Sequence, residues 1–193
     1  MSDILASPSA MPAGGTGGRP PGRQEIPIWR PTARLLVVDP DERVLLFGSV
    51  DDDDDRKHWW FTPGGGVQDG ETIREAAVRE LAEETGFACT EAELGPVVAT
   101  SASQFTGYDG RLYLGAHTFF FLRVPHREIV SDGQEDYEIA FITGHRWWTA
   151  DELRATADDV FPPPLALTGL LGRLLRGDVP DPPVRLPRRD PGS

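Results

Sequence analysis

The middle of the chain alternates between short apolar runs that are rich in β-forming residues and segments with helical periodicity. Residues 32–38 and 43–47 are the first two β-rich runs, and Asp39-Pro40-Asp41-Glu42 joins them as a hairpin-like turn. Further strands are predicted near residues 58–61, 97–103, 112–124 and 144–148. Helices are predicted from about Glu71 to Gly86, from the capping residue Thr149 onward, and over residues 165–176. Strands on both sides of a central helix fit a mixed sheet that is covered by helices.

Both ends of the chain differ in composition from this middle part. Residues 1–26 are rich in Pro, Gly, Ser and Ala, and residues 177–193 contain five prolines. Such segments bury too little apolar surface to offset the entropy lost on ordering. We therefore expect two disordered tails around one domain at residues 27–176. Within that domain the five consecutive aspartates at 51–55 repel one another, which favours a solvated loop.

The overall charge limits the classes of partner. The 193 residues suit one compact domain. They include 19 Lys and Arg against 31 Asp and Glu, a formal net charge of −12. An acidic protein is a poor electrostatic match to a nucleic acid backbone, so we expect no nucleic acid partner. Small polyanionic substrates remain compatible with this charge if metal ions screen them.

Cysteine content and hydropathy indicate the cellular compartment. The single cysteine, Cys89, cannot form an intramolecular disulfide, which fits a reducing environment and a role as a small buried filler. No apolar run approaches the roughly 20 residues that a membrane span needs. The N-terminus also lacks the basic region and apolar core of a secretory signal. We expect a cytoplasmic protein without a membrane partner.

The segment 65–87 carries the most informative pattern of polar residues. On a helix at about 100° per residue, Glu80, Glu83 and Glu84 fall within about one 100° face. No Lys or Arg follows any of these glutamates by four residues, so the helix itself neutralises this face poorly. A hard divalent cation such as Mg²⁺ prefers carboxylate oxygens and would neutralise it. A neighbouring stripe of the helix is suited to the core and consists of Ala77, Val78, Leu81 and Thr85.

The same segment resembles the signature of the Nudix hydrolases, Gly-x5-Glu-x7-Arg-Glu-U-x-Glu-Glu-x-Gly-U, in which U is aliphatic or aromatic. Every specified position matches, at Gly65, Glu71, Arg79, Glu80, Leu81, Glu83, Glu84, Gly86 and Phe87. Seven identities at fixed spacing arise by chance at a given start roughly once in a billion. The preceding Trp60-x-x-Pro63-Gly64-Gly65 looks like the lead-in of the family. Gln68, where many members carry glutamate, departs from them outside the strict signature and bears on fine tuning of the site.

The resemblance implies an α/β fold, a Nudix-type α/β/α sandwich with a central mixed β-sheet. It also implies that Glu80, Glu83 and Glu84, with a backbone carbonyl near Gly64, bind catalytic Mg²⁺, for which Mn²⁺ would substitute. Glu80 and Glu83 are the expected catalytic carboxylates, and Glu80 is a candidate general base as well as a ligand. Arg79 is expected to pair with Glu71 and so to orient the junction between loop and helix.

Substrate-binding residues are specified less closely. Gly65 and its neighbouring glycines leave room for close approach of the backbone to an ion or a phosphate. Arg34, in the first predicted strand, is a candidate for contact with a substrate phosphate. Glu138 or Glu135 is a further candidate, because members of the family often place a metal-binding or catalytic glutamate in that loop.

The leading hypothesis is a Mg²⁺-dependent, MutT-like hydrolase that cleaves the pyrophosphate bond of a nucleoside diphosphate linked to another moiety. Metal-activated water would attack phosphorus, with positioning and electrostatics supplying most of the rate. Nucleoside triphosphates and ADP-ribose-like nucleotide sugars are equal candidates for this small nucleotide substrate, since residues 101–105 hold neither marker proline nor tyrosine. A non-catalytic nucleotide-sensing module and an isomerase on the same fold are the alternatives. The resemblance also allows a homodimer.

Overall fold

The computed structural model of the chain describes residues 26–51, 54–106, 111–130, 142–156 and 159–187. Its helices are α1 (Ile73–Thr85), α3 (Ala150–Ala155) and α4 (Pro164–Leu175). Its strands are β1 (Ile28–Val38), β2 (Val44–Asp51), β3 (Asp54–Phe61), β4 (Val97–Thr106), β5 (Leu112–Arg123), β6 (Gly144–Trp148), β7 (Asp159–Phe161) and β8 (Val184–Arg185). The helices and central strands predicted from the sequence are confirmed at these positions. Among the described helices, none combines the length and apolarity that crossing a membrane requires.

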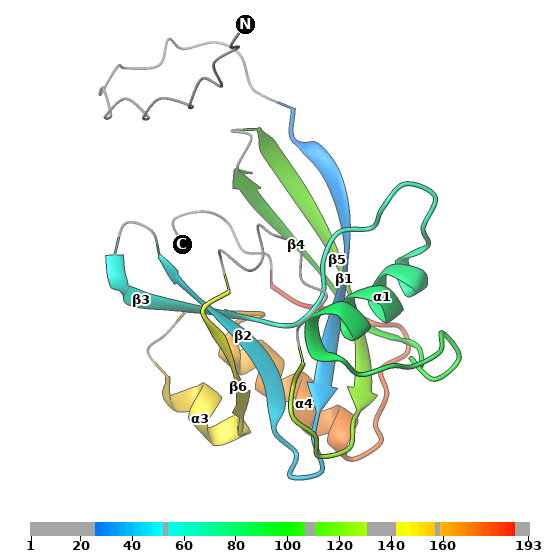
Figure 1. Cartoon of the computed structure of the whole chain (residues 1–193), viewed down its shortest axis with the longest axis vertical. Helices are drawn as coiled ribbons and strands as arrows, with labels where there is room; N and C mark the ends of the chain where they lie inside the picture. Colours follow the sequence, from blue (N-terminus) through cyan, green and yellow to red (C-terminus); the bar gives the residue numbers. More distant parts are fainter. Residues whose placement is uncertain (1–25, 52–53, 107–110, 131–141, 157–158, 188–193) are drawn as a thin grey trace, which may run out of the picture.

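The strands form one mixed sheet in the order β7-β3-β2-β1-β5-β4-β8, with β6 paired to β2. β1 runs parallel to β5 along its whole length, from Ile28 opposite Tyr113 to Val38 opposite Arg123. Its antiparallel pairing with β2 is confined to Val38 opposite Val44, and the two strands then diverge (Figure 1). One edge of β1 is therefore left for the loop that follows β3.

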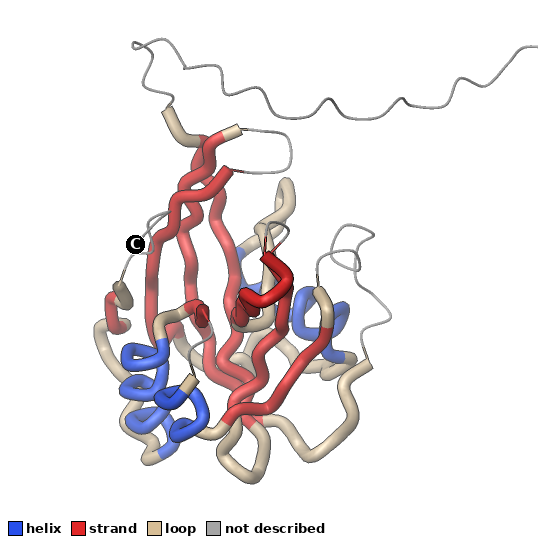
Figure 2. The backbone as a smooth tube through the Cα atoms, turned by 90° about the vertical axis from the view of Figure 1, so that its left-hand side faces the viewer, coloured by secondary structure: helices blue, strands red, loops and turns tan. Residues whose placement is uncertain are grey.

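Apolar residues of β1 fill a core on each face of the sheet. Leu35 and Val37 belong to the core that includes α1, whereas Leu36 and Val38 belong to the core that includes α4. Successive side chains of a strand point to opposite faces, so a continuous apolar run serves both cores. Figure 2 shows helical segments on both sides of the strands. The α/β/α sandwich with a central mixed sheet is confirmed.

Helix α1 begins and ends at residues whose local chemistry favours those boundaries. Thr72 Oγ1 accepts a hydrogen bond from the Glu75 amide at 3.2 Å, and the Glu75 carboxylate accepts from the Thr72 amide at 2.7 Å. This reciprocal capping box satisfies two donors that a helix start leaves unpaired. Gly86 ends the helix with a φ of 70°, a left-handed conformation that glycine adopts without steric cost.

The run of aspartates differs in part from its expected conformation. Asp51 is the last residue of β2 and pairs with Asp54, the first residue of β3. A ladder is formed by backbone groups, so the paired strands continue into the acidic run despite its charge. The expectation of a loop is wrong for the residues in these strands, and residues 52–53 lie outside the described part of the chain.

The C-terminal segment differs more clearly. Val184 of β8 pairs in parallel with Ala99 of β4, and the amide of Leu186 donates to the Thr100 carbonyl at 2.8 Å. The Leu186 side chain is buried in the core that includes α4. The expectation of a disordered tail is therefore wrong for residues 177–187, because a short strand and one buried leucine attach the segment to the edge of β4. The expectations for residues 1–25 and 188–193 concern positions outside the described residues.

Replacing Leu186 tests this attachment. We expect Leu186→Ala to lower the free energy of unfolding by about 2 kcal/mol, the low end of the cost for removing a buried leucine. Val179→Ala, at an exposed position of the same segment, should change it by less than about 0.5 kcal/mol. Urea unfolding followed by circular dichroism gives both values. Equal stabilities of the two variants would contradict the packing of this segment.

Candidate functional site

The loop between β3 and α1 lies along the free edge of β1. The Leu35 amide donates to the Pro63 carbonyl at 2.9 Å, and the Ala33 amide donates to the Gly65 carbonyl at 3.0 Å. Gly66 forms an isolated antiparallel bridge with Thr32. These contacts hold the glycine loop, residues 64–66, as a short extra strand between β1 and α1.

Helix α1 presents its glutamates to this loop. Glu84 accepts a hydrogen bond from the Gly64 amide at 2.6 Å and is only 2% exposed. Glu80, which is 4% exposed, lies against Gly65 so closely that a Cβ on this glycine would stand 2.4 Å from Glu80 Oε1. Glu83 is the more accessible of the three, with 36% of its side chain exposed. The structure thus brings Glu80 and Glu84 against the glycine loop. Glycine is required at position 64, where φ is 120° and an added Cβ would lie 2.2 Å from the Ala33 carbonyl oxygen.

Arg79 connects these carboxylates to the start of the helix. Its Nε donates to Glu71 at 2.9 Å, and its Nη1 donates to Glu80 at 2.8 Å and to Glu83 at 2.9 Å. Its Nη2 donates to the Gly66 carbonyl at 3.0 Å. The hydrogen bond to Glu71 and, to a smaller extent, the negative charge of Glu80 raise the pKa of Arg79. The guanidinium of Arg79 in turn lowers the pKa of Glu71. One side chain therefore fixes the relative position of loop and helix.

The sequence had pointed only to the contact between Arg79 and Glu71. The helix face was expected to be poorly neutralised because no cation follows its glutamates, yet Arg79 precedes Glu83 by four residues and bonds to it. A search in both directions along the helix would have found this pair. The bond to Glu80 also depends on the bend of the Arg79 side chain toward the loop, which spacing does not reveal.

Arg34 approaches the loop from β1. Its Nη1 donates to the carbonyls of Thr62 at 3.0 Å and Gly64 at 2.9 Å, and its guanidinium lies 6.0 Å from the centre of the Phe61 ring. This candidate for phosphate contact thus holds the loop backbone, including the carbonyl expected to bind metal. The other candidates, Glu135 and Glu138, lie outside the described residues.

The donor set fits a hard divalent cation. Burying carboxylates such as Glu80 and Glu84 without a cation is costly, and Arg79 offers one positive charge to three carboxylates. Carboxylate and carbonyl oxygens are the ligands that Mg²⁺ and Mn²⁺ take. Among the described residues, the oxygens of Glu80, Glu83 and Glu84 do not converge within 4.8 Å of one another. Arg79 and the Gly64 amide hold them instead, so a bound cation would replace part of this hydrogen bonding.

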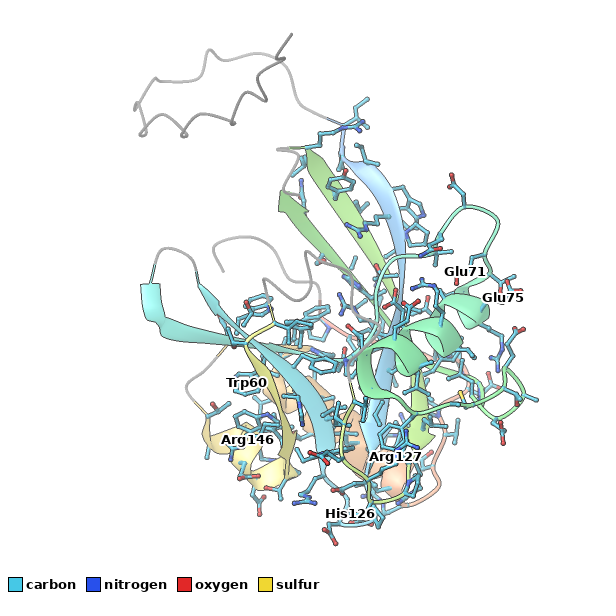
Figure 3. All side chains as sticks on the ribbon, in the orientation of Figure 1. Trp60, Glu71, Glu75, His126, Arg127 and Arg146 are labelled. Carbon is cyan, nitrogen blue, oxygen red and sulfur yellow. The ribbon has the colours of Figure 1, made fainter. Side chains whose placement is uncertain are left out.

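Another cluster of metal-ligating groups lies elsewhere in the fold. Asp39, Asp41 and His126 bring ligand atoms within 4.8 Å of one another at the turn between β1 and β2. Asp39 already accepts from the Arg43 side chain at 2.8 Å and from two backbone amides, which closes the turn. Figure 3 shows His126 far from Glu71 and Glu75 at the start of α1. This cluster is therefore separate from the glutamates of α1.

An open hollow of about 610 Å³ lies beside the N-terminal end of α1. Its lining includes Glu71 and Arg79 but none of the three glutamates that face the glycine loop. The other charged groups of the lining are acidic and would repel a phosphate: Asp69, Glu75 and Glu91. The hollow is therefore a poor candidate for phosphate binding.

A buried histidine lies on the face of the sheet that is opposite α1. His117 is 5% exposed, its Nε2 is 2.7 Å from Ser103 Oγ, and its ring packs edge-on against Phe161. Burial, together with the charge of Arg34, lowers the pKa of His117 to about 3. The imidazole is therefore neutral at physiological pH. From the sequence it was expected to be a strand residue, and it does lie in β5.

Comparison with known proteins shows the family to which the chain is similar. The family model described as NUDIX domain matches residues 29–166, and no curated protein matches the chain significantly. A MutT protein from Methanosarcina mazei Go1 is 16% identical with a TM-score of 0.55, covering 79% of this chain and 96% of that one. A mutator MutT protein from Bacillus halodurans is 20% identical with a TM-score of 0.51, covering 84% and 91%. The E. coli dihydroneopterin triphosphate pyrophosphohydrolase is 21% identical with a TM-score of 0.50, covering 76% and 99%. At these identities the solved structures show a shared fold.

Removing the guanidinium tests its part in stability. Arg79→Gln removes the ion pair of Arg79 with the buried Glu80, and we expect the free energy of unfolding, measured at pH 7 with a chelator present, to fall by about 2 kcal/mol. Since the folded protein lowers the pKa of Glu71, the stabilisation of this pair is present above the ordinary glutamate value of 4.5 and is lost as pH falls through the folded value. The variant should therefore lose less stability than wild type below pH 4.5.

Arg154→Gln is the matched control, because Arg154 forms an exposed ion pair with Asp151 on α3. We expect it to change stability by less than about 1 kcal/mol. Wild-type stability of Arg79→Gln in urea unfolding would show that the contacts of Arg79 contribute nothing to the fold.

Burial of a neutral histidine predicts a second pH effect. Because the folded pKa of His117 is about 3 and the ordinary value is 6.5, the unfolded chain binds a proton that the folded protein excludes between these values. Wild-type stability should fall as pH drops below 6.5, by up to about 1.4 kcal/mol per pH unit from this group. His117→Gln should show a shallower dependence in urea titrations from pH 7 to pH 4.5. The exposed His126→Gln is the control, and equal slopes in all three proteins would refute the assignment.

Proposed function

The chain belongs to the Nudix hydrolase family, and from this premise we propose that it is a Mg²⁺-dependent pyrophosphatase acting on nucleoside diphosphate derivatives. The observation that carries the proposal is the complete set of Glu80, Glu83 and Glu84 on α1, with Glu84 bonded to the Gly64 amide, Glu80 lying against Gly65 and Glu83 bonded to Arg79. Two of these carboxylates are almost fully buried against the loop, in which a Cβ at Gly64 would lie 2.2 Å from the Ala33 carbonyl oxygen. The carboxylates of an ordinary solvated helix face would instead be exposed to water.

Glu80, Glu83, Glu84 and the Gly64 carbonyl would hold the divalent cation, Mg²⁺ or in its place Mn²⁺. A cation bound there supplies polarisation of a phosphoryl oxygen and lowers the pKa of a water molecule near phosphorus. The chain's own contribution is to keep the carboxylates in position. Arg79 and Glu71 join the helix start to the loop, and Arg34 holds the loop against β1. Glu80 or Glu83 would take the proton from the attacking water, and Glu83 has the greater exposure.

The substrate we propose is a small nucleotide with a pyrophosphate linkage, either a nucleoside triphosphate or an ADP-ribose-like nucleotide sugar. Water attack on one phosphorus would release two phosphorylated fragments. The formal charge of −12 argues against a nucleic acid partner and requires cations near the phosphates. We further propose cytoplasmic location without a membrane partner, and a homodimer as the assembly to test. A non-catalytic sensing role has no supporting observation, because every glutamate of the signature is present.

Substitution of one carboxylate tests the proposal. We expect Glu83→Gln to lower kcat at least about 100-fold while the protein stays folded, since a ligand and candidate base loses its charge. The assay measures phosphate and nucleotide release from a panel of nucleoside triphosphates and nucleotide sugars, with Mg²⁺, with Mn²⁺ and in chelator. Asp69→Asn, at an exposed loop position near Glu71, is the control and should keep wild-type rates. Metal-independent hydrolysis, or full activity of Glu83→Gln, would reject the proposed mechanism.

A further inference from the structure

One face of β1, β4 and β5 changes from apolar to polar along its length. The face opposite α1 starts in the core with Leu36 and Phe119. Alternation along β1 then places Arg34, Thr32 and Arg30 on this same face. The strands continue past the helices toward the top of Figure 1. We call this surface the polar sheet face, and its residues are Arg30, Thr32, Arg34, Ser103, Tyr113 and His117.

Arg30 is the accessible cation of this face. It is exposed, and within the described part of the chain its guanidinium forms no hydrogen bond or ion pair with another residue. It lies 5.9 Å from the centre of the Tyr113 ring on β5. The residue paired with Arg30 across the ladder is Gly115, which contributes no side chain to crowd the guanidinium. Arg30 is thus an exposed side chain that lies near both the Tyr113 ring and the backbone of Gly66.

The glycine loop separates Arg30 from the glutamates of α1. A Cβ built on Gly65 would meet Glu80 Oε1 at 2.4 Å, and a Cβ built on Gly66 would meet Arg30 Nε at 3.2 Å. Consecutive residues of an extended segment face opposite sides, so these two glycines mark the two sides of one thin strip of backbone. Their Cα atoms are about 3.8 Å apart. Glu80 and Arg30 therefore lie beside adjacent residues of the glycine loop, on opposite sides of its backbone.

The neighbouring arginines are already engaged. Arg79 bonds to three carboxylates, and Arg34 Nη1 bonds to the carbonyls of Thr62 and Gly64. Among the residues that the structure describes, none bonds to the Arg30 guanidinium, which can therefore bind a phosphate in the bidentate geometry for which arginine is best suited. In a protein with a formal charge of −12, such a cation near the glutamates also lowers the repulsion that a polyanionic substrate meets.

His117 adds a second polar group on the same face, two residues along β5 from Gly115, the residue paired with Arg30. Its Nδ1 is buried and has no hydrogen-bond partner among the described residues, while Nε2 contacts Ser103. Buried polar atoms usually have a hydrogen-bond partner, and the described residues supply none to this one. Because the imidazole is neutral, it suits an uncharged donor or acceptor next to a phosphate rather than the phosphate itself.

We propose that Arg30, which lies near the Tyr113 ring, binds one phosphate of the substrate. Water attacks the other phosphate, which would lie at the glutamates of α1. The polar sheet face would receive the moiety attached to the phosphate at Arg30. The inference rests on the proposed function only for the position of the attacked phosphate. It assigns to Arg30 the contact that the sequence had suggested for Arg34.

Binding of an analogue that resists hydrolysis tests this inference. The probes are the α,β-methylene analogues of ATP and of ADP-ribose, titrated with Mg²⁺ into the full chain by calorimetry. We expect Arg30→Gln to weaken binding of at least one analogue about 10- to 100-fold, since a charged hydrogen-bond pair is lost. Arg30→Lys should recover part of the loss, because it keeps the charge without the fork geometry. Arg154→Gln, an exposed arginine on α3, should bind like wild type.

The outcomes separate the subsite from the catalytic proposal. Wild-type affinity of Arg30→Gln, an equal loss in Arg154→Gln, or no binding of either analogue to the wild-type protein overturns the inference. Weaker binding by folded Arg30→Gln in a protein that hydrolyses no substrate of the panel supports the subsite and rejects the catalytic proposal. If the wild-type protein is active, Arg30→Gln should raise KM about 10-fold or more and should change kcat by a smaller factor. Thermal unfolding should stay close to wild type, since Arg30 is exposed.

Discussion

The geometry of the site depends on the guanidinium of Arg79. It connects Glu71 before the helix, Glu80 and Glu83 on the helix, and the Gly66 carbonyl in the glycine loop. Three negative charges and a carbonyl dipole on one delocalised cation form a charge-assisted network with little rotational freedom. The network holds Glu71, Glu80 and Glu83 around one guanidinium despite the repulsion among their charges. The stability of the junction and the position of the proposed metal ligands therefore rest on the same contacts.

This network functions because the sheet leaves an edge open. β1 and β2 separate after the pair formed by Val38 and Val44, and the glycine loop takes the vacated edge of β1. The loop is then a thin strip with α1 on one side and the polar sheet face on the other. A side chain would not fit at Gly64, where a Cβ would collide with the Ala33 carbonyl oxygen of β1. The residues proposed for catalysis and those proposed for substrate binding thereby lie on opposite sides of one backbone segment.

Charge is distributed unevenly around that strip. The glutamates lie on the α1 side, and the arginines of β1 lie on the other side, with Arg34 bonded to the loop and Arg30 exposed. A nucleotide needs both environments, since its phosphates bind cations while its attacked phosphorus needs carboxylate-bound metal and water. Arg34 stabilises the loop conformation, which explains why an arginine early in β1 is not by itself a sign of phosphate contact.

Features with short-range causes were predictable from the sequence. The α1 glutamates share a face because of helical periodicity, Gly86 ends the helix because of its freedom at positive φ, and the motif at residues 65–87 identified the family. The reciprocal cap of Thr72 and Glu75 could also have been predicted from their spacing. The contacts of Arg34 with Gly64, of Arg30 with Gly66 and of Leu186 with β4 join residues far apart in the sequence. Strand order and the divergence of β1 from β2 decide these contacts, and no local pattern encodes them, because they arise only when the whole sheet is assembled.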